Sequence, residues 1–140
     1  MSQDNGAPIH SGGCLCGGVR YELDAPIEGI SLCHCRQCRK ASGSAFVAVA
    51  VVNTAALRIT AGEGLLTAYR ATPGKQRVFC SRCGSPFFSA RDGQPEVRRL
   101  RIGTLDTPLG EVAKVHAFTA DCADWDEILD EHPRFPGFAR

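Results

Sequence analysis

The sequence contains no long hydrophobic run. Its longest strongly apolar stretch covers residues 45–52, far short of the roughly 20 residues that cross a bilayer as a helix. The residues before Gly13 also lack the apolar block of a secretory signal peptide. The sequence therefore predicts no membrane segment, and because nothing directs the chain to secretion, we expect a cytoplasmic protein.

The sequence also has little excess charge. Sixteen basic residues oppose fifteen acidic ones, which gives a net charge of +1, too little to attract phosphate backbones or anionic lipid. The densest basic cluster is Arg98, Arg99 and Arg101. On a strand Arg99 and Arg101 share the face opposite Leu100, which is the alternation of a solvated surface. Neither a nucleic acid nor a membrane is predicted as a partner.

Length and composition are those of one globular domain. The chain has 140 residues, of which 44% are hydrophobic and 22% charged, close to globular averages. We expect a flexible N-terminal tail over residues 1–11 and one domain over residues 12–140, because the tail lacks periodicity and a Gly12-Gly13 turn follows it.

Most segments favour strands. Alternating or β-branched patterns predict strands at residues 17–23, 44–52, 57–60, 65–70, 77–79, 86–90, 97–102 and 112–118. Helical spacing is limited to a short turn at residues 37–41 and a helix at residues 123–130, where Trp125, Ile128 and Leu129 share a face and Asp121 is a candidate N-cap. The pattern predicts a mainly β domain.

The unusual component is cysteine, which occurs eight times. Seven cysteines form three tight groups, Cys14/Cys16, Cys33/Cys35/Cys38 and Cys80/Cys83, and Cys122 stands alone. In a reducing compartment such groups are more often metal ligands or catalytic thiols than disulfides. The cysteine spacing therefore predicts metal binding.

The Cys80/Cys83 pair has the spacing of a zinc knuckle and requires a second pair to complete a four-sulfur site. That pair is either Cys14/Cys16 or two cysteines of the middle group, and spacing alone leaves both open. Pairing with Cys14/Cys16 accounts for more of the cysteines, because it leaves the middle group as three sulfurs with an unfilled fourth position, as in zinc sites that bind a substrate. Reversible disulfides are the alternative, although one intervening residue strains a bridge between Cys14 and Cys16.

The middle group has other interpretations. Cys35 and Cys38 have the spacing of a redox pair, but the chain lacks the βαβ pattern around thioredoxin-type motifs. His34 alternates with two ligands and is expected to point away from the metal as a hydrogen-bonding residue. Three cations follow His34 in the sequence, namely Arg36, Arg39 and Lys40. They either lie in solvent or bind the carboxylates of an anionic ligand.

Three sequence blocks resemble a known family. The blocks GCLCGGVRY (13–21), CHCRQCRKASG (33–43) and FCSRCGSP (79–86) are similar to the signature motifs of the glutathione-dependent formaldehyde-activating enzyme (GFA) family, which also contains centromere protein V. His116 and the later Trp125 resemble its C-terminal block. The resemblance covers nearly the whole predicted domain.

The resemblance implies a zinc-binding, Mss4-like β-tent fold with two zinc ions per chain. Cys14, Cys16, Cys80 and Cys83 match the structural zinc ligands, whereas Cys33, Cys35 and Cys38 match the ligands of the catalytic zinc, which is the more readily lost. The implied activity is that of a carbon-sulfur lyase acting on a thiol such as glutathione. In the direction of addition, this reaction joins glutathione to formaldehyde and gives S-(hydroxymethyl)glutathione. Zinc bound there lowers the pKa of the thiol that coordinates it.

One segment departs from the family pattern. Many members carry lysine shortly before the C-terminal tryptophan, whereas this chain reads Asp-Cys-Ala-Asp-Trp at residues 121–125. Cys122 is either a packed small hydrophobic residue or a thiol near the metal. Two other functions stay open: a non-catalytic zinc module that binds a protein or nucleic acid, and a thiol redox protein.

Overall fold

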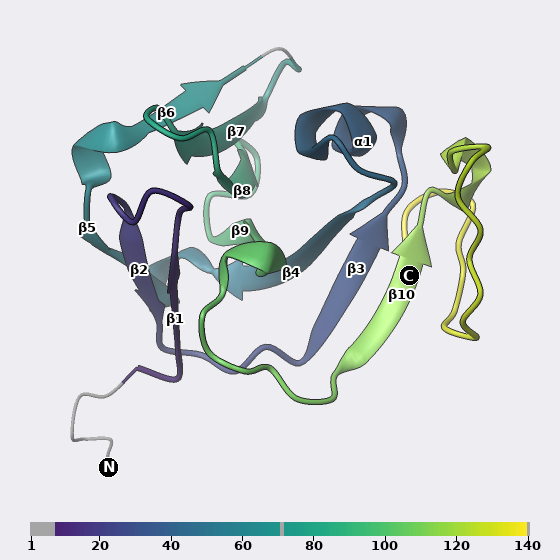
Figure 1. Ribbon diagram of the computed structural model, residues 1–140, viewed down its shortest axis with the longest axis horizontal. Helices are drawn as coiled ribbons and strands as arrows, with labels where there is room; N and C mark the ends of the chain where they lie inside the picture. The colour runs from purple at the N-terminus through teal and green to yellow at the C-terminus, as the bar shows by residue number, and fades with distance from the viewer. Residues whose placement is uncertain (1–7, 71, 140) are drawn as a thin grey trace.

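The computed structural model describes residues 8–70 and 72–139, and its strands form two sheets (Figure 1). The smaller sheet has the order β1-β2-β5, with β1 at His10–Gly13, β2 at Arg20–Leu23 and β5 at Leu57–Ala61. Both pairings are antiparallel. Tyr21 and Leu23 are fully buried and alternate along β2 with half-buried neighbours, so the period of two in the sequence corresponds to an inner and an outer face.

The larger sheet has seven strands in the order β10-β3-β4-β9-β8-β7-β6. Its strands are β3 (Gly29–Cys33), β4 (Val47–Asn53), β6 (Leu66–Tyr69), β7 (Lys75–Cys80), β8 (Pro86–Arg91), β9 (Val97–Arg101) and β10 (Ala113–Ala117). Neighbours are antiparallel except β3 and β10, which run parallel and pair Cys33 with Ala117. The parallel pair brings a C-terminal strand beside the middle cysteine group.

The helices of the described residues are short. The α-helix α1 spans Arg36–Ser42; Cys35 caps its first turn and Gly43, with a φ of 65°, ends it in the left-handed conformation that glycine adopts readily. Four 3-10 turns lie at Thr54–Ala56, Glu63–Leu65, Ile102–Thr104 and Thr119–Asp121. None of the described helices has the length and hydropathy to cross a membrane.

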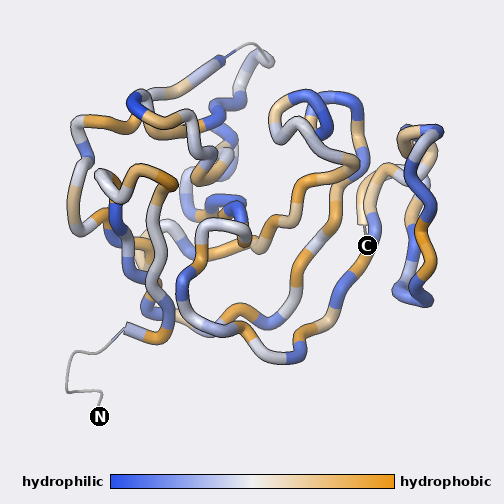
Figure 2. Tube along the Cα trace, viewed as in Figure 1, coloured by the Kyte–Doolittle hydropathy of each residue, from blue (hydrophilic) through white to orange (hydrophobic). Residues whose placement is uncertain are grey.

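The main core lies between the two sheets. Val19, Tyr21 and Leu23 from the small sheet pack with Phe87 and Leu100 from the large one. The rings of Tyr21 and Phe87 meet edge to face at 5.8 Å, a favoured aromatic geometry. Figure 2 shows hydrophobic residues along the inner strands and hydrophilic residues over much of α1. This core fixes the turns that carry the cysteines.

The mainly β prediction is confirmed, and each of the eight predicted strands overlaps an observed one. Two strands were not predicted, β1 and β3. Strand β1 begins at His10, a buried residue inside the segment expected to be a tail; residues 1–7 of that tail lie outside the described residues. The turn predicted at residues 37–41 corresponds to α1.

The helix predicted at residues 123–130 is wrong. After the turn at Thr119–Asp121 the chain continues without regular structure. The prediction placed Trp125 and Leu129 on the apolar face of this helix, but their side chains are 69% and 80% exposed. Short helices depend on packing of an apolar face, and this face contacts no core. Instead, the C-terminal segment lies beside β10, where His116 and Phe118 donate their backbone N–H groups to Pro133 and Gly137 (Figure 1).

Candidate functional site

Four cysteines from two distant turns meet in one cluster. Cys14 and Cys16 lie in the turn after β1, Cys80 ends β7, and Cys83 lies in the turn before β8. Their sulfurs are all within 4.8 Å of one another. The distances Cys14–Cys16 and Cys16–Cys80 are 3.5 and 3.9 Å, close to the roughly 3.8 Å between sulfurs on a tetrahedral zinc with 2.3 Å bonds, whereas a disulfide needs about 2.05 Å. The geometry fits a four-sulfur metal site.

Hydrogen-bond donors surround this four-sulfur cluster. The Gly18 N–H and the Arg82 Nε–H donate to Cys16 Sγ at 3.4 and 3.3 Å, and they lower the pKa of the Cys16 thiol. The hydroxyl and backbone N–H of Ser85 lower the pKa of Cys83 to about 5. Because metals bind thiolates rather than thiols, these donors prepare the cluster for a metal.

The middle group forms a second cluster where β3 passes into α1. Cys33 ends β3, Cys35 caps the helix and Cys38 lies in its first turn, with all three sulfurs within 4.8 Å of one another. The Cys38 N–H donates to Cys35 Sγ at 3.3 Å. A hydrogen bond from Cys38 lowers the pKa of Cys33. In the described part of the chain no fourth metal-binding side chain joins this group, so the geometry fits a metal with one open position.

A buried arginine lies close to the three-sulfur cluster. Arg101 is only 7% exposed, and its Nη1 donates to the Ser89 hydroxyl and the Arg99 carbonyl, both at 3.1 Å. Burial lowers its pKa, whereas the Cys38 and Cys33 thiols act to raise it. The solvated position predicted for Arg101 is therefore wrong, because β9 lies between β4 and β8 inside the large sheet and Arg101 binds Ser89 of β8 there. Nothing in the local pattern separates this arginine from Arg98 and Arg99, which are only half-buried.

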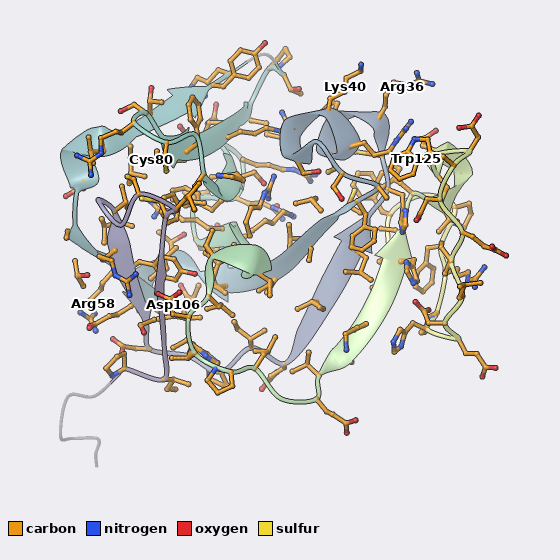
Figure 3. The ribbon with its side chains drawn as sticks, in the orientation of Figure 1. Arg36, Lys40, Arg58, Cys80, Asp106 and Trp125 are labelled. Carbon is orange, nitrogen blue, oxygen red and sulfur yellow. The ribbon has the colours of Figure 1, made fainter. Side chains whose placement is uncertain are left out.

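Two hollows flank α1. An apolar cavity of about 280 Å³ is lined by Val47, Val78 and Phe88, with Arg77 and Arg101 at its wall. A polar hollow of about 260 Å³ is lined by Arg36, Arg39, Lys40, Gly43, Ser44 and Trp125. Figure 3 shows Arg36 and Lys40 on α1, with Trp125 on the C-terminal segment beside the helix. No carboxylate lines this polar hollow in the described part of the chain, which suits it to an anionic ligand.

A chain of polar side chains links β3, β10 and the C-terminal segment. His34 Nε2 lies 2.9 Å from His116 Nδ1, and His116 Nε2 lies 3.0 Å from an oxygen of Asp130. On its other side, His34 Nδ1 lies 3.5 Å from Cys122 Sγ. His34 is fully buried and points away from the three-sulfur cluster as predicted. Cys122 is half-buried, and its thiol lies against a histidine.

The sequence matches a family model and several curated proteins. Residues 9–121 match the family model described as "Glutathione-dependent formaldehyde-activating enzyme". Proteins of Halomonas elongata and Penicillium rubens, both named "Putative glutathione-dependent formaldehyde-activating enzyme", are 30% identical over 125 residues and 31% identical over 144 residues. These matches cover 84% and 96% of this chain, and 79% and 66% of the two relatives.

A solved structure has a similar fold. The crystal structure of a Rhodobacter sphaeroides protein, a structural genomics target, aligns with a TM-score of 0.60 at 27% identity. The alignment covers 74% of this chain and 98% of that one. The arrangement of strands seen here is therefore shared with a protein of known structure.

Proposed function

This chain belongs to the glutathione-dependent formaldehyde-activating enzyme family, and we propose that it is a zinc-dependent carbon-sulfur lyase-like enzyme that forms or cleaves a thiol adduct of glutathione type. S-(hydroxymethyl)glutathione, formed from glutathione and formaldehyde, is the proposed product. The proposal depends on one observation, the division of seven cysteines into a closed four-sulfur cluster and an open three-sulfur cluster. The closed cluster is suited to a structural zinc, and the open cluster is suited to a zinc that binds a substrate thiol.

The clusters have separate roles in this proposal. Cys14, Cys16, Cys80 and Cys83 hold a structural zinc that clips the turn after β1 to the β7–β8 turn. Cys33, Cys35 and Cys38 hold a second zinc, which when bound supplies a position where a substrate thiol loses its proton. Three thiolates around a divalent ion leave an excess negative charge, and the buried guanidinium of Arg101 compensates part of it.

The cations of the polar hollow bind the substrate. Glutathione carries two carboxylates, and Arg36, Arg39 and Lys40 present positive groups beside the three-sulfur cluster. Within the described residues none of these three forms an ion pair, and the buried Nε of Arg39 has no acceptor. A carboxylate in the hollow satisfies these donors through charge-assisted hydrogen bonds.

The reaction balances without an external oxidant. The thiol sulfur bonds to the carbonyl carbon of formaldehyde, the carbonyl π bond breaks, and the oxygen takes up the proton that the thiol released. Bound carboxylates hold the glutathione sulfur at the three-sulfur cluster, which removes part of the entropic cost of bringing two molecules together.

The test measures adduct formation from glutathione and formaldehyde by exchange NMR. We expect Cys35→Ser to abolish the rate enhancement, because it removes one of three ligands. Arg39→Gln is expected to raise the KM for glutathione about tenfold, as for one charged hydrogen bond of about 1.4 kcal/mol. Unchanged turnover in Cys35→Ser overturns the proposal.

The matched control is Arg58→Gln. Arg58 lies on β5, where it pairs with Glu22 and Asp24 at 3.0 Å, and Figure 3 shows it on the opposite side of the molecule from α1. This variant also removes one arginine charge, but outside the site, so its KM for glutathione is expected to be unchanged. A glutathione diester, which lacks both carboxylates, is expected to reproduce the KM defect of Arg39→Gln with the wild-type protein.

A further inference from the structure

We propose a third metal site, formed by His34, Cys122 and Asp126 and separate from both cysteine clusters. One ligand atom from each of these residues lies within 4.8 Å of the other two. The site joins the residue after β3 to the irregular C-terminal segment. It goes beyond the proposed adduct chemistry, which uses none of these three side chains.

The hydrogen-bond network directs a lone pair of His34 into this site. The Asp130 carboxylate accepts hydrogen bonds, so His116 Nε2, at 3.0 and 3.1 Å from its oxygens, carries a proton. A neutral imidazole then has an unprotonated Nδ1, which accepts from His34 Nε2 at 2.9 Å. His34 Nδ1 is left without a proton, and it faces Cys122. With both histidines neutral, these hydrogen bonds leave the lone pair of His34 Nδ1 directed at Cys122.

This network has the form that surrounds metal-bound histidines. Such a histidine donates its second N–H to a fixed acceptor, which orients the ring and increases the basicity of the ligand nitrogen. Here the acceptor is His116, itself held by Asp130. His34 is fully buried between the rings of Phe46 and His116, with centroids at 5.2 and 5.1 Å, so its orientation needs no adjustment on binding.

The distance between the first two ligand atoms fits zinc. With a Zn–N bond of about 2.05 Å and a Zn–S bond of about 2.3 Å, tetrahedral geometry separates nitrogen and sulfur by about 3.6 Å. The separation of His34 Nδ1 from Cys122 Sγ is 3.5 Å. The half-buried Asp126 adds an oxygen ligand and a negative charge. A nitrogen, sulfur and oxygen set suits zinc, which accepts all three.

The test counts zinc ions on the full-length reduced protein by native mass spectrometry at saturating zinc, without substrate. We expect three ions on the wild type and two on Cys122→Ser and on Asp126→Asn. Asp124→Asn is the matched control, because Asp124 is an exposed acid in the same segment that is not in the cluster; it is expected to keep three. Far-UV circular dichroism checks that each variant is folded.

A double variant separates this site from the three-sulfur cluster. If the sites are independent, Cys35→Ser holds two ions and Cys35→Ser with Cys122→Ser holds one. A double variant with the same count as each single variant means that Cys122 serves the three-sulfur cluster, which overturns the proposal. Equal zinc counts in the wild type and Cys122→Ser overturn it as well. Because no turnover is measured, failure here leaves the adduct proposal untouched, and failure of the adduct assay leaves the ion count untouched.

Discussion

The sharpest prediction concerns Cys16, the exposed member of the four-sulfur cluster. Its side chain contributes little to the core because it lies at the surface, so Cys16→Ser costs almost no hydrophobic burial. A structural zinc contributes on the order of 10 kcal/mol to folding, comparable with the total stability of a domain. If losing one ligand weakens zinc binding a thousandfold, the free energy of unfolding falls by about 4 kcal/mol.

The assay is urea unfolding followed by far-UV circular dichroism, under reducing conditions at a fixed zinc concentration. Leu15→Ala is the control, because Leu15 lies between two proposed ligands and is 88% exposed; we expect a change within about 0.5 kcal/mol. Chelation of the wild type is expected to lower its stability further than Cys16→Ser does, because the chelator removes the ion whereas the variant only weakens its binding. Equal unfolding midpoints for Cys16→Ser and Leu15→Ala would refute the structural role of this cluster.

Three other changes test the fold and the cluster. Gly62→Ala is expected to destabilise the protein by about 2 kcal/mol or more in the same urea assay, because Gly62 has a φ of 77° and an added Cβ would collide with the Gly18 carbonyl; a smaller loss would contradict this backbone geometry. Leu100→Ala removes a fully buried side chain and is expected to cost about 2–5 kcal/mol, and a midpoint within error of the wild type would exclude its place in the core. Arg82→Ala removes a donor that lowers the pKa of Cys16, so protons compete better with the metal for this thiolate. We expect the variant to release zinc at a higher pH than the wild type when a chromogenic chelator follows the release. Release at the same or a lower pH would contradict the reasoning.

Strand positions could be predicted where a period of two extends over several residues. Arg20–Leu23 was found this way, because Tyr21 and Leu23 lie on one face of the strand and pack in the core. Gly29–Cys33 was missed because its buried and half-buried residues do not alternate, and its place depends on pairing with β10, more than eighty residues later. Tertiary pairing of this kind leaves little trace in the local pattern.

The two cysteine clusters were predicted from spacing, because a metal site requires ligands of fixed type at short intervals and such intervals are visible in a sequence. Coordination chemistry alone left the choice of partner for Cys80 and Cys83 open. The structure brings them to Cys14 and Cys16. The charges around the sites were not predictable, because the burial of Arg101 depends on which strands cover β9.

The proposed third metal site depends on the residue that faces His34. Cys122 Sγ lies 3.5 Å from the buried His34 Nδ1, and a cation at this place would repel a metal from that nitrogen. A thiol at the same place reverses that effect, since thiolate sulfur binds zinc directly. His116, which is itself bound to Asp130, holds His34 in position whichever residue lies opposite the His34 Nδ1. Cys122 thereby gives the buried His34 nitrogen the metal-binding neighbour that the proposed third site requires.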